Sequence, residues 1–272
     1  MTETVKILCL AVVQGLTEFL PVSSSGHLVL AQRFLGVQSP GPDLELFLHV
    51  GTLVSICVFY RRRLASLFAD LAHGRRAGIL YAAWVLVSMV PAGVAYACGK
   101  PFFDGIYDSP RTVAALLAAN GALLLLSALA ERRSRAGREK PLDGFRAFAM
   151  GVGQAVAVLP GISRSGTSIS AGRLFGLGPK QAAEFSFVMS IPVIAGAALL
   201  EFAETGRIRA ALDGAEIPGF PVAIGPALAA AALAGAVGWI ALRVVVRVLD
   251  RGSFWAFGPW CLFVGALAWF FG

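Results

Sequence analysis

Four long stretches of this sequence contain no charged side chain, and they limit the folds open to the chain more than any other feature. About 20 apolar residues in a helix can cross the hydrocarbon core of a bilayer. The uncharged stretches of roughly this length cover residues 79–98, 112–130, 217–242 and 253–272. Two shorter apolar runs, 46–60 and 185–200, can also span if flanking polar residues lie at the interface. We therefore predict an all-α polytopic membrane protein with six transmembrane helices.

The composition supports a membrane protein and argues against a nucleic-acid partner. Hydrophobic residues make up 57% of the chain and charged residues 14%, whereas soluble domains have about 25% charged residues. The net charge of +7 comes from basic residues in short segments between apolar runs, so they do not form a folded basic face. The cysteines lie in or beside apolar segments without metal-type spacing, so we expect them to serve packing: Cys9, Cys57, Cys98 and Cys261.

The basic residues also predict how the chain crosses the membrane. Sixteen of the 23 Lys and Arg residues fall in four segments between the predicted spans: 61–76, 131–146, 173–180 and 243–251. Cytoplasmic loops of membrane proteins are enriched in Lys and Arg. These segments are therefore expected in the cytoplasm, with both termini on the outer side.

A polar motif near the start of the chain is repeated about 140 residues later. Leu20-Pro21 followed by Ser23-Ser24-Ser25-Gly26 is echoed by Leu159-Pro160 followed by Ser163-Arg164-Ser165-Gly166. Three predicted spans separate the copies, so they should enter the membrane from opposite faces, as in inverted-topology repeats. We predict a single domain, 1–272, with repeat 1 at about 1–130 and repeat 2 at about 141–272.

Each copy lies within an apolar stretch, 7–36 or 145–176, that is interrupted by proline and a Ser-Gly cluster. An unbroken span would place Glu18 in hydrocarbon, at a cost of about 2.5–3.5 kcal/mol on insertion scales. Irregular backbone is tolerated at membrane depth when protein or a water-filled cavity surrounds it. We therefore predict two re-entrant helical hairpins whose tips meet inside the protein.

The helix after each break should point its positive end and unpaired N–H groups at the tips, which favours anion binding. Arg164 would clamp phosphate oxygens there, although an arginine can also extend to the membrane interface. The residues predicted to bind phosphate are Ser23, Ser25, Gly26, Ser163, Ser165, Gly166 and Thr167.

Gln14 and Glu18 are four residues apart and should share one helix face. Their oxygens could hold a divalent cation, which proteins often bind through one or two carboxylates and substrate phosphates. The alternative for both is interhelical hydrogen bonding.

Ser24 and His27 form a candidate nucleophile and base, because a serine hydroxyl needs a neighbouring base before it attacks. The alternative is a helix-capping serine and an interior histidine. His49 and His73 are interpreted as a structural and a solvated residue.

The segment from Gln14 to His27 and the segment from Pro160 to Gly166 resemble the two signature motifs of the undecaprenyl-diphosphate phosphatase family, also called the bacitracin-resistance protein family. Glu184 to Phe187 with Pro192 is also similar, and the resemblance covers essentially the whole chain. It implies hydrolysis of undecaprenyl diphosphate to the monophosphate, which recycles the lipid carrier for peptidoglycan synthesis. It also implies a multi-pass protein of the bacterial inner membrane, with a site open to the periplasmic side and a requirement for Mg²⁺ or Ca²⁺.

By position, the resemblance assigns catalytic roles to Glu18, Ser24, His27 and Arg164, and metal binding to Gln14 and Glu18. Many members carry Glu where this chain has Gln14, so the metal would be held with one fewer charge. Ser24, His27 or a metal-bound water remain open as the nucleophile, and both a monomer and a homodimer remain open. A secondary transporter or flippase of a phosphorylated lipid is the alternative function, because broken helices in inverted repeats are typical of transporters.

Overall fold

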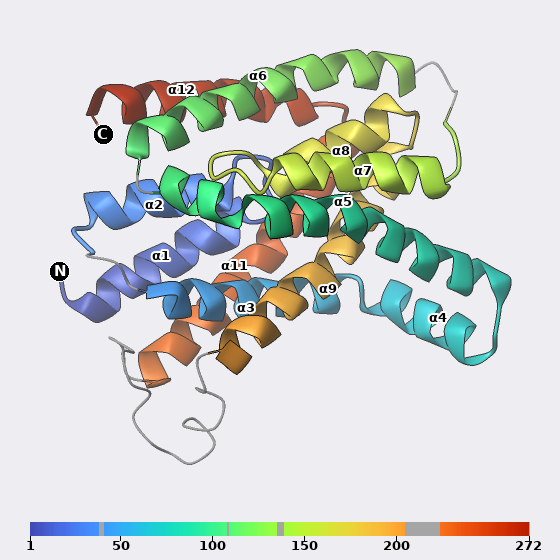
Figure 1. Cartoon of the computed structure of the whole chain (residues 1–272), viewed down its shortest axis with the longest axis horizontal. Coiled ribbons are helices and arrows are strands. Elements are labelled where there is room, and N and C mark those ends of the chain that lie inside the picture. Colours follow the sequence, from blue (N-terminus) through green and yellow to red (C-terminus); the bar gives the residue numbers. More distant parts are fainter. Residues whose placement is uncertain (38–40, 108, 135–138, 205–223, 272) are drawn as a thin grey trace.

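The computed structural model describes residues 1–37, 41–107, 109–134, 139–204 and 224–271, and every regular element in these ranges is a helix. Figure 1 shows most of the helices lying lengthwise in stacked layers, with α9 and α11 crossing them obliquely. The all-α prediction is confirmed. Of the predicted span 217–242, residues 217–223 lie outside the described ranges.

Four helices are long and apolar enough to cross a bilayer without a break. They are α5 (Arg76–Tyr107), α6 (Pro110–Ser134), α9 (Pro179–Glu204) and α11 (Ile224–Asp250). Each contains most of one predicted span, so the chain is a multi-pass membrane protein. Pro192 lies within α9, where the helix continues through it.

The other two predicted spans differ from straight transmembrane helices. Helix α3 (Gly41–Phe59) is followed by α4 (Arg61–Ala72), and the two meet at a bend of 74°. Helix α12 (Phe257–Phe271), preceded by the 3-10 turn η1 (Phe254–Ala256), has 15 residues and covers about 22 Å at 1.5 Å per residue. Within the described ranges, length and composition therefore support four spans, or five with the bent pair, where the sequence predicted six.

Both predicted hairpins are broken helix pairs. Helices α1 (Glu3–Thr17) and α2 (Ser24–Phe34) flank the first break, and α7 (Gly144–Val156) and α8 (Arg164–Leu174) flank the second. None of these four is long enough to cross a bilayer alone. The breaks follow from Pro21 and Pro160, because proline has no N–H to continue a helix.

The two breaks share their local geometry. Ser23 Oγ accepts a hydrogen bond from Gly26 N at the start of α2, and Ser163 Oγ accepts one from Gly166 N at the start of α8. Both following helices end at a glycine in the left-handed region, Gly36 with φ 61° and Gly176 with φ 95°. The repeated motif therefore specifies the same capped start and the same stop twice.

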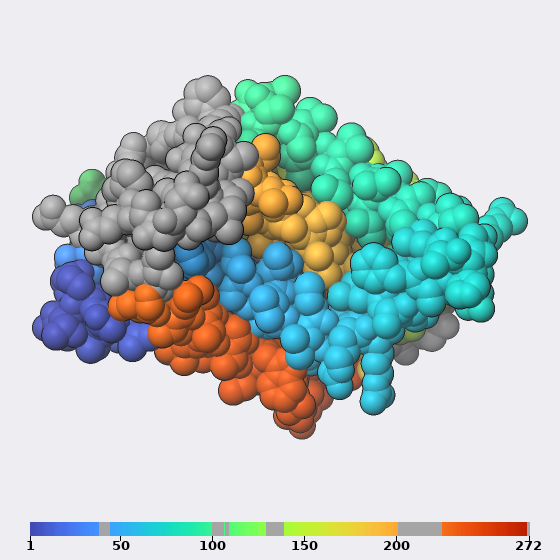
Figure 2. Space-filling view, turned by 90° about the horizontal axis from the view of Figure 1, so that it is seen from below, coloured from blue at the N-terminus to red at the C-terminus, as the bar shows by residue number. Residues whose placement is uncertain are grey.

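The two breaks meet in the interior, as the hairpin prediction requires. A Cβ added to Gly26 would lie 3.2 Å from the Cα of Gly161, so the two backbones pack at close range. Asn120 of α6 joins them: its Nδ2 donates to Pro21 O at 2.9 Å, and its Oδ1 accepts from Ser163 N at 3.0 Å. Figure 2 shows α9 between α3 and α5 on the face seen from below.

Candidate active site

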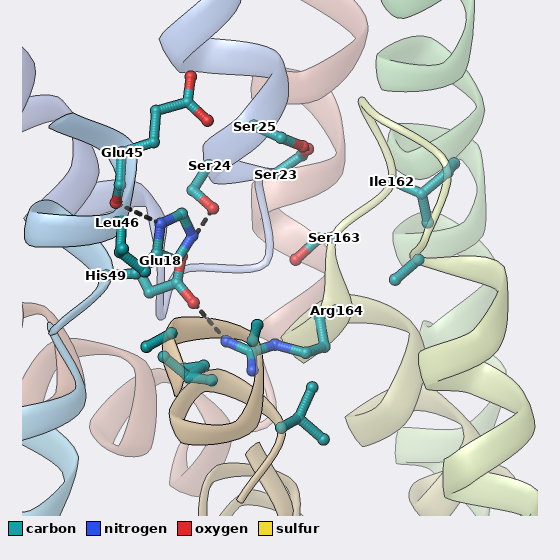
Figure 3. A pocket seen from close by; sticks show the side chains of 15 residues that line it. Glu18, Ser23, Ser24, Ser25, Glu45, Leu46, His49, Ile162, Ser163 and Arg164 are labelled. Carbon is teal, nitrogen blue, oxygen red and sulfur yellow. Dashed lines mark hydrogen bonds and ion pairs between the residues drawn. The ribbon is translucent and has the colours of Figure 1, made fainter. Parts of the chain in front are cut away.

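A cavity of about 370 Å³ lies where the two breaks meet. Its polar lining from the breaks consists of Glu18, Ser23, Ser24, Ser25, Ser163 and Arg164. Helix α3 adds Glu45 and His49, and α9 adds apolar side chains such as Val193. Figure 3 shows Glu18, Ser24, His49 and Arg164 converging from different elements on one region of this cavity.

Glu18 is the centre of the polar network, with its side chain only 3% exposed. Its Oε1 accepts a hydrogen bond from the guanidinium of Arg164, which also forms an ion pair with it. Its Oε2 accepts from Ser24 Oγ at 2.7 Å and from Gln14 Nε2 at 3.0 Å. A buried carboxylate needs such donors, because its desolvation is otherwise unfavourable.

Ser24 stands at the first residue of α2 with its hydroxyl directed at the carboxylate (Figure 3). A carboxylate that accepts the O–H hydrogen bond is placed to take the proton when the oxygen attacks an electrophile. The geometry thus places a hydroxyl that could act as a nucleophile in contact with a carboxylate that could act as its base. The acceptor in contact with Ser24 is Glu18, whereas the sequence analysis paired Ser24 with His27.

His27 is held by groups other than the Ser24 hydroxyl. Its Nε2 accepts from Trp260 Nε1 of α12 at 3.0 Å, so the ring is neutral and its Nδ1 donates to Ser23 O at 2.9 Å. Ser23 has φ 69°, which is rare for a residue with a side chain. Both ring nitrogens are therefore engaged, and one of them stabilises the unusual backbone conformation immediately before Ser24.

The predicted phosphate-binding residues divide into two groups. Ser23, Ser25 and Ser163 line the cavity. Gly26 and Gly166 use their N–H groups in the caps described above, and Thr167 Oγ1 donates to Ser163 O at 2.9 Å within its own helix. Ser165 Oγ donates to Leu20 O at 3.3 Å and so joins the two breaks. This second group supports the cavity without lining it.

Three polar residues near the site were not predicted to belong to it. His49 Nε2 lies 3.6 Å from Glu18 Oε2, while its Nδ1 donates to Glu45 O at 2.7 Å. Glu45 lines the cavity and accepts from Gln32 Nε2 at 2.9 Å. Asn120 ties the two breaks together, and its signal in the sequence was a single amide inside an uncharged span, where polar side chains form interhelical bonds.

The fit of a divalent cation can be tested on Gln14. Its side chain is fully buried, and Oε1 has no hydrogen-bond partner within the described residues, although Nε2 is bonded to Glu18. An unpaired buried amide oxygen next to a carboxylate is a suitable partial ligand set for a hard cation. No group of three or more His, Cys, Asp or Glu side chains in the described ranges could hold a metal alone. The remaining ligands would therefore have to come from substrate and water.

Comparison with known proteins gives one consistent result. Residues 7–267 match the family model described as bacitracin resistance protein BacA. A relative named undecaprenyl-diphosphatase from Rubrobacter xylanophilus is 40% identical, over 98% of this chain and 97% of its own length. Relatives with the same name from Desulfosudis oleivorans and Salinibacter ruber are each 36% identical, over 97% and 96% of both chains respectively.

Proposed function

This chain belongs to the family of bacitracin resistance protein BacA, and we propose on that basis that it hydrolyses undecaprenyl diphosphate to undecaprenyl phosphate and inorganic phosphate. The observation that carries the proposal is the contact of Ser24 and Arg164 with the two oxygens of Glu18 in one cavity. A solute pathway needs binding groups, whereas this site also pairs a nucleophile with a base. An enzyme therefore accounts for the arrangement better than a transporter does.

The reaction begins when the terminal phosphate of the substrate enters the cavity. Ser24 Oγ attacks its phosphorus and transfers its proton to Glu18. A bond forms between Oγ and phosphorus, and the bond from phosphorus to the bridging oxygen breaks. Undecaprenyl phosphate leaves, and water then hydrolyses the phosphoserine to inorganic phosphate and free serine.

Arg164 links substrate binding to the readiness of the base. Without substrate, its guanidinium is paired with Glu18 Oε1. Phosphate oxygens compete for the same planar donors, and Arg binds them in bidentate fashion. When the phosphate takes the guanidinium, Glu18 Oε1 is released, while Oε2 still accepts the hydrogen bond from Ser24.

A divalent cation, Mg²⁺ or Ca²⁺, belongs to the same proposal. Glu18 and the unpaired Oε1 of Gln14 would hold it together with phosphate oxygens from the substrate. When bound, the cation would neutralise charge on the diphosphate. Gln14 would contribute a neutral oxygen, so the charge of the substrate would have a large share in binding the cation.

The proposed setting is the bacterial inner membrane, with the cavity open to the periplasmic side. The proposal is supported by the distribution of Lys and Arg, because segments 61–76 and 243–251 are rich in them, as cytoplasmic loops usually are. The cavity lies among residues near the start of α3 and the end of α9, and the segments that adjoin those ends are poorer in Lys and Arg.

The experiment is phosphate release by protein purified in detergent, with farnesyl diphosphate and Mg²⁺. Wild type should release inorganic phosphate, and Ser24→Ala and Arg164→Gln should each lower kcat at least 100-fold. Ser127→Ala is the control, because this buried hydroxyl bonds within α6 to Leu124 O. No release by well-folded wild type would refute the proposal.

Trapping the intermediate identifies the nucleophile. Substrate labelled in its terminal phosphate should leave acid-stable label on Ser24 after a rapid quench. Acid-labile, base-stable label on His27 would move the attack to the imidazole. Absence of label on either residue during turnover would indicate direct attack by water.

A further inference from the structure

A second cavity, of about 540 Å³, adjoins the first and lies between α5, α7 and α9. Four residues line both cavities: Ala157, Arg164, Val193 and Ala197. The rest of the second lining is mainly apolar, with Met89 and Tyr96 from α5 and Leu200 from α9. We call this second cavity the α5–α9 chamber. Arg164 therefore stands at the boundary between a polar cavity and an apolar chamber.

The chamber reaches the surface that faces lipid. Tyr96 is 52% exposed and Leu200 is 63% exposed, and both lie in helices long and apolar enough to span the membrane. Figure 2 shows α9 next to α5 on one face of the molecule. An apolar chain can thus pass from the bilayer into the chamber without crossing water.

One polar side chain of the chamber has no partner. Gln154 is 3% exposed, and neither its Nε2 nor its Oε1 has a hydrogen-bond partner within the described residues. In the repeated motif it corresponds to Gln14, which bonds to Glu18 four residues later. Four residues after Gln154 stands Val158, which offers the amide no side-chain acceptor. A buried amide without partners is stabilised by a ligand that accepts from its Nε2 and donates to its Oε1. A phosphate oxygen can accept from Nε2, and a water can donate to Oε1.

We propose that the α5–α9 chamber holds the first isoprene units of the lipid tail, with the phosphate attached to that tail between Arg164 and Gln154. This inference rests on the proposed function and adds the orientation of the substrate, with its tail in the α5–α9 chamber and its terminal phosphate in the polar cavity. The terminal phosphate then points into the polar cavity toward Ser24. The bridging oxygen, which leaves with the lipid, lies on the chamber side of Arg164.

Two glycines make the chamber testable without disturbing the fold. Gly93 of α5 and Gly196 of α9 line it, and a Cβ added to either meets nothing within 4 Å. Leucine has a higher helix propensity than glycine, so Gly93→Leu and Gly196→Leu should fold. Gly225 of α11 also has open space around it but lies outside the chamber lining, so Gly225→Leu is the matched control.

The measurement is kcat/KM for two substrates that differ in tail length. Farnesyl diphosphate has a tail of 15 carbons, and dimethylallyl diphosphate has a tail of five carbons. Wild type should prefer the longer substrate. Each chamber variant should reduce the ratio of the two kcat/KM values at least ten-fold, whereas Gly225→Leu should leave this ratio within two-fold of wild type. An unchanged ratio in both chamber variants would overturn the placement of the tail, and would indicate that ordinary membrane lipid fills the chamber.

Gln154 is tested separately as a positioning residue. Gln154→Leu removes both polar atoms at similar size and should raise KM for both substrates at least five-fold. If the amide were only an unsatisfied core group, Gln154→Leu would raise the thermal midpoint and leave KM unchanged, which would overturn its assignment. Failure of wild type to release phosphate from either substrate is a different result, because it refutes the proposed function itself.

Discussion

Glu18 illustrates how a single acidic residue is accommodated at membrane depth. An isolated carboxylate there costs about 2.5–3.5 kcal/mol on insertion scales. In this protein Arg164, Ser24 and Gln14 all donate to it. The groups that stabilise Glu18 are also groups to which the proposed reaction assigns roles. Structural support and chemistry are therefore combined in the same contacts.

Replacing Glu18 with Gln tests its role as the base. The amide keeps the size of the side chain but accepts a proton poorly and loses the ion pair with Arg164. We expect kcat for phosphate release to fall by about 10²–10⁴-fold, the usual contribution of a positioned general base. Elution as a folded species on size exclusion in detergent is the control. A kcat within ten-fold of wild type would assign proton removal to another group.

His27→Gln tests whether the imidazole positions Ser24 or removes its proton. As a positioning residue that holds Ser23 at its positive φ, it should lower kcat by about 10-fold to 100-fold, in line with the 1–3 kcal/mol typical of such strained positions. The acidic limb of the pH–rate profile should stay where it is in wild type. Loss of that limb in the variant would make His27 the base.

At this scale the sequence predicts which side chains gather but not how all of them pair. Glu18, Ser24 and Arg164 were recognisable because polar groups in apolar stretches are costly unless they serve a site. The partner of His27 could not be predicted, because Trp260 lies 233 residues away and the backbone of Ser23 turns the ring toward it. His49 lies near Glu18 because of how α3 packs against the first break. The residues next to His49 in the sequence do not indicate this contact.

At the scale of elements, α6 holds the two breaks in register. Asn120 bonds to the carbonyl of Pro21 and to the N–H of Ser163, two groups that the breaks leave outside any helix. Ser165 and the close approach of Gly26 and Gly161 add to this junction. One side chain of a spanning helix therefore fixes the relative position of Glu18 and Arg164.

Asn120→Leu should weaken this junction. The substitution leaves the buried Ser163 N–H without its acceptor, at about 1–3 kcal/mol, and leaves Pro21 O with the weaker donor Cys261 Sγ. We expect a lower thermal midpoint in detergent and a lower kcat, because Arg164 and Glu18 are no longer held together. Ser127→Ala on the same helix removes a hydroxyl bonded only within α6 and should change neither quantity appreciably. Equal midpoints for the two variants would show that α6 does not organise the breaks.

The sequence predicts long elements well and interrupted ones less completely. The uncharged stretches correctly predicted α5, α6, α9 and most of α11. The prolines correctly predicted both broken helix pairs. The span predicted at 46–60 became a helix bent by 74° against α4, since Tyr60 ends α3 before the three arginines that begin the next helix. The last predicted span became a 3-10 turn and a 15-residue helix, because Pro259 near its start favours a new first turn.

For the whole molecule, the proposed orientation in the membrane rests on the distribution of Lys and Arg. Segment 61–76 carries five arginines and contains α4, whereas Ser109 lies between α5 and α6 in a segment with few basic residues. In the proposed orientation, the positive-inside tendency favours a cytoplasmic location for the first segment and an outer location for the second. The cavity should then receive substrate from the outer leaflet.

Labelling of single cysteines checks this orientation. In a variant free of the four native cysteines, Ser109→Cys should react with a membrane-impermeant maleimide in spheroplasts. His73→Cys, at the end of α4, should react only after the membrane is permeabilised. The reverse pattern would place the cavity on the cytoplasmic side.

The packing of α12 has a consequence for how this protein is made. Gly258 of α12 lies against Gly121 of α6, and Trp260 reaches back to His27. During synthesis, Glu18, Ser24 and Arg164 enter the bilayer before α12 has been translated. The contacts that α12 makes with α6 and with His27 can therefore form only later. Nascent chains should therefore remain inactive until α12 has been translated and has packed against α6.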